Sequence, residues 1–111
     1  MVRTAVDTTS ETYRANRERM LARVADLAEQ LQLAVVAGGD RNIERHRRRG
    51  KLTARERIEL LVDADSPFLE LSPLAAWGTD FPVGAGIVTG IGVIEGVECV
   101  ISGNDATVRG G

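Results

Sequence analysis

The stretch IVTGIGVIEGVECVIS, residues 87–102, decides the fold of this chain. Two runs rich in β-branched residues, 87–94 and 97–102, flank the dipeptide Glu95-Gly96, a pattern typical of two strands joined by a tight hairpin turn. Counting outward from the turn gives the pairs expected on one face: Ile94 with Val97, Gly92 with Cys99, and Gly90 with Ile101. The other face is expected to pair Val93 with Glu98, Ile91 with Val100, and Thr89 with Ser102. Small residues oppose large ones on the first face only, so we expect close packing on that side.

A long amphipathic helix is expected over residues 9–37. Its apolar stripe recurs at spacings of three and four: Tyr13, Arg17, Met20, Val24, Leu27, Leu31 and Ala34. Thr8 followed by Glu11 is the pattern of a capping box, and Gly38-Gly39 is a common helix end. Because the stripe is narrow and Arg17 interrupts it, we expect this helix to lie against the body of the protein or a neighbouring subunit.

Two shorter helices are expected next, each with a signal at its start. Asp40 is expected to cap a basic helix that ends before Gly50. Thr53 and Glu56 form a second capping-box pattern ahead of an apolar run. These three helices precede everything in the chain that is expected to be extended.

The remaining segments indicate a piece of a larger protein. Residues 68–71 are expected to be extended, and residues 77–86, rich in Gly and Pro, to form a loop. A two-stranded ribbon is marginally stable unless other elements cover it, and only a short segment ending in Gly110-Gly111 follows the hairpin. We therefore expect the chain to be a fragment.

Composition and charge limit the function. Of the 111 residues, 43% are hydrophobic and 27% charged, as in soluble globular proteins. Residues 1–57 carry 13 Lys/Arg and 8 Asp/Glu, whereas residues 58–111 carry 1 and 8. No stretch approaches the roughly 20 apolar residues of a membrane helix, and the N-terminus lacks the apolar core of a secretory signal. The single Cys99 excludes an internal disulfide and a multi-cysteine zinc site. We expect a cytoplasmic protein without a membrane segment and without a metal in this chain.

The segment 44–51 concentrates five cations and His46 in eight residues. Such a cluster attracts phosphate groups, or it is a solvated helix that pairs with acidic groups elsewhere. A nucleic acid is disfavoured as the partner because aromatic residues that stack on bases are absent from the segment. His46 is expected to be structural, since its arginine neighbours oppose its protonation, and Cys99 is expected to be a small buried hydrophobe.

Three blocks of the sequence resemble the carboxyltransferase β subunits of biotin-dependent acyl-CoA carboxylases. The first block is RGKLTARERI (49–58) and the second is SPFLELSPLA (66–75). The third is GAGIVTGIG (84–92), followed by ECVI (98–101) and NDATVRGG (104–111). The second block and the ending are most similar to the branch that acts on 3-methylcrotonyl-CoA and related branched acyl-CoAs. Propionyl-CoA and acetyl-CoA are the alternative substrates.

The resemblance implies an α/β fold of the crotonase (ClpP/crotonase) type. Residues 1–62 would form an N-terminal helical arm, and residues 63–111 the incomplete start of the N-terminal crotonase-like carboxyltransferase domain. It further implies that carboxybiotin, carried by a biotin carboxylase/biotin carrier α subunit, gives its carboxyl group to an acyl-CoA enolate, and that β subunits form a homo-oligomer. In the family, backbone amides from later loops hold the oxyanions. We therefore expect no catalytic residue in this chain, and no activity from the 111-residue piece alone.

The same resemblance points to a binding site for CoA, whose phosphate groups suit Arg and Lys. The candidate residues are Arg49, Lys51, Arg55, Arg57, Asp105, Thr107, Gly110 and Gly111. Arg55 and Arg57 would lie about 200° apart on their helix, so at most one can face the ligand while the other pairs with an acidic neighbour. The alternative function is a non-enzymatic helical interaction module whose basic segment binds an acidic or phosphate-bearing partner.

Overall fold

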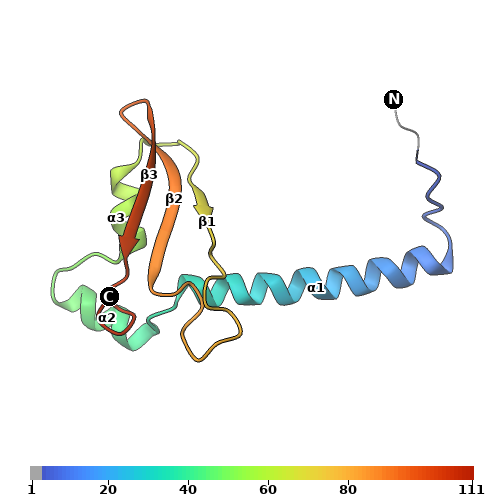
Figure 1. Ribbon diagram of the computed structural model, residues 1–111, viewed down its shortest axis with the longest axis horizontal. Helices are drawn as coiled ribbons and strands as arrows, with labels where there is room; N and C mark the ends of the chain where they lie inside the picture. Colours follow the sequence, from blue (N-terminus) through green and yellow to red (C-terminus); the bar gives the residue numbers. More distant parts are fainter. Residues whose placement is uncertain (1–3) are drawn as a thin grey trace.

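The computed structural model describes residues 4–111, so the first three residues of the predicted arm lie outside the described range. Its elements are α1 (Glu11–Val35), α2 (Asp40–Arg48), α3 (Ala54–Leu61), β1 (Leu69–Leu71), β2 (Ile87–Ile94) and β3 (Val97–Asn104). The strands form one antiparallel sheet in the order β1-β2-β3. Helix α3 lies beside this sheet, and α1 extends far away from it (Figure 1). None of the described helices has the length and apolar content to cross a membrane.

The hairpin has the predicted register throughout. All six predicted pairs, from Ile94 with Val97 to Thr89 with Ser102, are observed, and β3 runs two residues further than expected. Glu95 and Gly96 both adopt left-handed conformations, with φ of 49° and 77°. The Asp63 carboxylate accepts hydrogen bonds from the amides of Glu95 (2.7 Å) and Gly96 (2.8 Å), so a residue just after α3 holds the turn.

The core lies on the face of the hairpin that carries Gly90 and Gly92. Four residues form its buried centre: Ala54, Ile58, Val88 and Ile101. Val62, Phe68, Ile94 and Cys99 are half-buried against them. The Phe68 ring lies over Gly90, where a Cβ atom would come within 2.6 Å of Phe68 Cε2 and 2.7 Å of the Leu69 carbonyl oxygen. The close packing predicted for this face is therefore confirmed, and Cys99 packs as a small hydrophobe at its edge.

The opposite face of the sheet is open. It carries the exposed side chains Leu69, Leu71, Ile87, Ile91 and Val100. The chain exposes 8652 Å² of surface, whereas a compact protein of 11.9 kDa exposes about 6,000 Å². Its radius of gyration is 18.7 Å, compared with about 13 Å for a compact domain of this length. Both differences reflect an open sheet face and a projecting α1.

Helix α1 begins at a different cap from the one predicted. Ser10 is the N-cap, and its Oγ accepts the Tyr13 amide at 3.2 Å. The capping box of Thr8 and Glu11 is therefore wrong. The Asp7 carboxylate binds the Thr9 amide (2.8 Å) and the Thr9 hydroxyl (2.6 Å), and this turn brings Ser10 to the cap. The Thr9 hydroxyl, together with the Thr9 amide, holds the pKa of Asp7 below its ordinary value.

The predicted cap of α2 is wrong, and the predicted cap of α3 is confirmed. Asp40 does not cap α2: Gly39, with φ of 71°, occupies the cap position, and no side chain bonds the free amides there. Asp40 is instead the first helical residue, where its negative charge interacts favourably with the helix dipole. At α3 the capping box is present, since Thr53 Oγ1 accepts the Glu56 amide (3.3 Å) and Glu56 Oε2 accepts the Thr53 amide (2.7 Å).

Candidate functional site

A helix-ending turn positions the start of the site. Gly50, with φ of 70°, donates its amide to the Arg47 carbonyl (2.9 Å), and Lys51 donates to the His46 carbonyl (3.3 Å). This pair of bonds is the Schellman motif, in which a left-handed glycine stops a helix and reverses the chain. The His46 ring then reaches across the turn, with Nε2 at 3.1 Å from the Leu52 carbonyl oxygen. The turn thus fixes Lys51 at the junction between α2 and α3.

A cleft of about 480 Å³ opens at this junction, and we call it the basic cleft. Its lining residues are His46, Gly50, Lys51, Leu52, Ala54, Arg57, Asn104 and Ala106. Three of these side chains are basic and none is acidic. Within residues 4–111, neither Lys51 nor Arg57 forms an ion pair. Asn104, at the end of β3, adds a side-chain amide that can donate hydrogen bonds. The basic cleft therefore has the charge and the donors to bind an anion such as phosphate.

Arg55 has a structural role. It forms two parallel hydrogen bonds to the Glu70 carboxylate, at 2.7 Å and 2.8 Å, with both side chains mostly buried. This bidentate pair ties α3 to β1. The expected division between Arg55 and Arg57 is therefore observed: one pairs with an acidic neighbour, and the other lines a cleft.

A second ion pair closes the other side of the helix junction. Arg47 on α2 contacts Glu56 on α3 at 2.6 Å. The Thr53 amide, followed by Arg47, holds the pKa of Glu56 below its ordinary value. Glu56 also lines an adjacent cleft, together with Asp40, Glu59 and Asp105. Arg47 and Arg55 also line this adjacent cleft, so it holds both acidic and basic side chains, whereas the lining of the basic cleft includes no acidic side chain.

The remaining predicted site residues lie elsewhere. Asp105 Oδ1 accepts the amide (2.9 Å) and the hydroxyl (2.6 Å) of Thr107. Thr107 is buried against Gly38, where a Cβ atom would collide with its side chain. Gly111 donates to the Val108 carbonyl at 2.8 Å, and Arg49 is exposed at the end of α2.

Of the eight predicted residues, the structure brings only Lys51 and Arg57 together in the basic cleft. The predicted set did not include the two other lining residues with polar side chains, His46 and Asn104. The position of His46 four residues before Gly50 was an available signal, because a Schellman turn there returns the chain to the last helical turn. No local signal placed Asn104 beside Lys51.

The part of the chain that matches a known protein family includes the residues of the basic cleft. Residues 45–111 match the model of the carboxyl transferase domain. The chain belongs to this carboxyltransferase family. It is 50% identical, over all of its length, to the probable biotin-dependent acyl-coenzyme A carboxylase β2 subunit of Mycobacterium tuberculosis. It is 49% identical over 96% of its length to the probable mitochondrial methylcrotonoyl-CoA carboxylase β chain of Drosophila melanogaster.

A solved structure confirms the predicted fold of this carboxyltransferase chain. The β subunit of geranyl-CoA carboxylase from P. aeruginosa superposes with a TM-score of 0.85 over 99% of the chain, at 38% identity. The α/β arrangement of a helical arm followed by the hairpin of a crotonase-like domain is therefore correct. The chain spans about a fifth of the length of these relatives, with 21%, 19% and 21% covered.

Proposed function

We propose that this carboxyltransferase chain is part of a β subunit that transfers a carboxyl group to an acyl-CoA enolate. The observation that carries the proposal is the 50% identity to a biotin-dependent acyl-CoA carboxylase β subunit over the whole chain. Carboxybiotin, carried by an α subunit with biotin carboxylase and biotin carrier functions, would supply the carboxyl group. Family membership favours this function over a non-enzymatic interaction module.

The proposed substrate is 3-methylcrotonyl-CoA or a related branched acyl-CoA. Support comes from relatives named for branched substrates, among them a probable methylcrotonoyl-CoA carboxylase and a geranyl-CoA carboxylase. Propionyl-CoA and acetyl-CoA are the alternatives. Which of these acyl-CoAs is the substrate depends on the residues that line the acyl pocket, and we assign no residue among 4–111 to that pocket.

We propose that the basic cleft holds a phosphate group of CoA. Lys51 and Arg57 would contact the phosphate oxygens, because they are the two cationic side chains of the cleft that lack acidic partners among the described residues. Binding there would anchor the CoA end of the substrate while the acyl group reaches catalytic loops outside these 111 residues. Arg55, already bound to Glu70, would instead support α3.

The test is a set of alanine variants in a full β subunit that carries this chain, assayed with its biotin-bearing partner. Losing a charge-assisted contact costs roughly 1.5–3 kcal/mol, so Lys51→Ala and Arg57→Ala should each raise KM for acyl-CoA roughly 10- to 150-fold. The turnover number kcat should change little if the contact is equally strong in the ground and transition states. Arg49→Ala, which removes a nearby exposed arginine outside the cleft, is the matched control.

Two results would contradict the proposal. An unchanged KM for both Lys51→Ala and Arg57→Ala would remove the CoA role from the basic cleft. Absence of carboxyl transfer to all three acyl-CoAs by the unmodified complex would remove the enzymatic function itself. We also expect the 111-residue chain by itself to transfer no carboxyl group, and transfer by the purified chain would contradict the assignment of the oxyanion amides to later loops.

A further inference from the structure

His46 is held inside the basic cleft by one of its two ring nitrogens. The side chain is half-buried, and Nε2 lies 3.1 Å from the Leu52 carbonyl oxygen. Because a carbonyl oxygen only accepts hydrogen bonds, Nε2 carries a hydrogen, and Nδ1 is the nitrogen that gains or loses a proton. The bond to Leu52 is compatible with both the neutral and the protonated ring. Protonation therefore adds a positive charge to the lining of the cleft and leaves the ring in its place.

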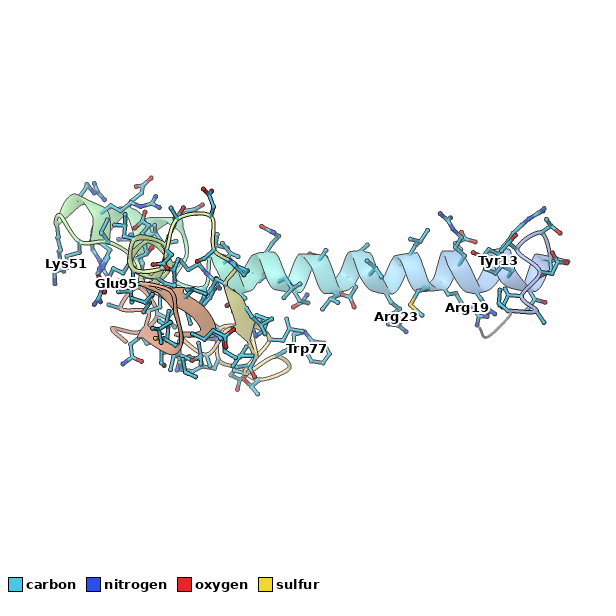
Figure 2. The ribbon with its side chains drawn as sticks, turned by 90° about the horizontal axis from the view of Figure 1, so that it is seen from above. Tyr13, Arg19, Arg23, Lys51, Trp77 and Glu95 are labelled. Atoms are coloured by element: carbon cyan, nitrogen blue, oxygen red, sulfur yellow. The ribbon has the colours of Figure 1, made fainter. Side chains whose placement is uncertain are left out.

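The charged side chains that share the lining with His46 are all positive. They are Lys51, from the turn after α2, and Arg57, from α3. Figure 2 shows Lys51 at the end of the molecule farthest from Tyr13 of α1, so the projecting part of that helix does not cover it. Asn104, from the end of β3, is polar and uncharged. An anion in the cleft therefore meets two positive charges when His46 is neutral and three when it is protonated.

The other charged groups of these elements lie outside the lining of the basic cleft. They are Glu44, Arg45, Arg47, Arg48 and Arg49 around the end of α2, Arg55, Glu56 and Glu59 on α3, and Asp105 after β3. Glu56 is bound to Arg47, and Asp105 is bound to Thr107. Among residues 4–111, no carboxylate in the lining is placed to neutralise a protonated His46.

Protonation of His46 and binding of an anion in the basic cleft favour each other. Lys51 and Arg57 repel a protonated imidazole, and a phosphate group bound between them attracts it. A ligand that binds the protonated form more tightly shifts the ring toward that form, and the proton strengthens binding of the ligand by the same factor. Imidazole changes its charge between about pH 5 and pH 8, and His46 is the only histidine of the chain.

We infer that His46 makes the basic cleft a pH-dependent phosphate site, which binds the phosphate group of CoA more tightly when the ring is protonated. The inference rests on the CoA role proposed above for Lys51 and Arg57. Affinity for the phosphate rises as the pH falls from about 8 to about 6, because a third positive charge joins the site. A single charge contact in a cleft that is partly open to solvent corresponds to a roughly 3- to 10-fold change in affinity.

The test measures KM for acyl-CoA at about pH 6 and about pH 8, in a full β subunit that carries this chain and is assayed with its biotin-bearing partner. His46→Gln keeps an amide N–H that can donate to the Leu52 carbonyl and is uncharged at every pH. A phosphate monoester also titrates near pH 6, so the quantity compared is the ratio of KM at pH 8 to KM at pH 6. This ratio should be roughly 3- to 10-fold larger in the wild type than in His46→Gln. Equal ratios would overturn the inference.

Two controls separate charge from structure. Arg45→Gln removes a charge from the neighbouring exposed side chain outside the cleft, and it should keep the wild-type ratio. If His46 served only to brace the turn, His46→Gln would change KM by the same factor at both pH values, and the two ratios would be equal. An acyl-pantetheine substrate, which lacks the phosphate groups, should give the same ratio in the wild type and His46→Gln. A difference that persists with this substrate would overturn the inference.

The proposed function and this inference fail in different ways. At about pH 8, where the imidazole is mostly neutral, Lys51→Ala and Arg57→Ala test the phosphate site itself. An unchanged KM in both variants would remove the CoA role and the inference with it. A raised KM in both variants, together with equal pH ratios in the wild type and His46→Gln, would overturn the role of His46 alone.

Calorimetry of free CoA binding to the full β subunit gives an independent measure. Titrations near pH 7 in buffers of different ionisation enthalpy report the protons taken up on binding. The wild type should take up more protons per bound CoA than His46→Gln, because binding draws a proton onto the ring. Equal proton uptake in the two proteins would overturn the inference.

Discussion

Replacing Gly90 with alanine tests how tightly the hairpin packs against β1. A Cβ atom at Gly90 would lie 2.6 Å from Phe68 Cε2 and 2.7 Å from the Leu69 carbonyl oxygen. The Phe68 ring can rotate away at the cost of part of its burial, but the carbonyl oxygen belongs to β1 and moves only if the strand moves. Overpacking of this kind costs roughly 1–3 kcal/mol. Since two separate groups must shift, we expect a loss near 3 kcal/mol.

The matched control is Gly103→Ala on β3. A Cβ atom there would lie 3.5 Å from Ile58 Cδ1, which is ordinary contact. The loss of glycine flexibility in the unfolded chain should therefore stabilise this variant by about 0.5 kcal/mol. Urea unfolding followed by circular dichroism measures both variants, and Gly90→Ala should also lower Tm by roughly 10–20 °C.

Two results would refute this account of the core. One is a Gly90→Ala protein as stable as the wild type, and the other is an equal loss in Gly103→Ala. Phe68→Leu combined with Gly90→Ala adds a sharper check, because removing the ring relieves only one of the two collisions. We expect the second substitution to recover part of the lost stability, and full recovery would mean that β1 is not fixed by its backbone.

Three further predictions concern the contacts of α3. Asp63→Ala should lower the free energy of unfolding, measured with urea, by about 2 kcal/mol, because it removes the acceptor of two turn amides. Asp63→Asn keeps one carbonyl acceptor, so its stability should lie between those of the wild type and Asp63→Ala. The lowered pKa of Glu56 means that its contribution to stability is complete above the ordinary Glu pKa of about 4.3 and is lost as the pH falls through the lower folded value. The thermal stability of wild-type protein should therefore fall more steeply below pH 4 than that of Glu56→Gln, and parallel curves would contradict this. Arg55→Ala should lower Tm by several degrees because it leaves the Glu70 carboxylate without its partner, whereas Arg57→Ala should leave Tm nearly unchanged.

The hairpin could be predicted residue by residue because a two-residue turn fixes every pair that follows it. The capping box of Thr53 and Glu56 was equally local, and the helical angle between Arg55 and Arg57 determined that they would have different roles. Which of them pairs with an acidic residue depended on where β1 places Glu70, and no pattern near residue 55 contains that information.

The errors arose where several residues compete for one local role. Thr8, Thr9 and Ser10 can all cap a helix, and the bonds of Asp7 to Thr9 decide in favour of Ser10. The basic cleft combines a helix end with Asn104 from β3, more than fifty positions along the chain from Lys51. Such a site depends on tertiary packing, and only its basic half could be read from the sequence.

The two cationic side chains of the basic cleft are held in place to different degrees: Arg57 firmly, and Lys51 less firmly. Arg55 anchors the first turn of α3 to β1, and Asp63 anchors the segment after its last turn to the hairpin, so Arg57 moves only with the sheet. Lys51 belongs to the turn after α2, whose attachment to α3 is the partly exposed pair of Arg47 and Glu56. An anion bound by both Lys51 and Arg57 would therefore restrain α2 relative to α3 and the sheet.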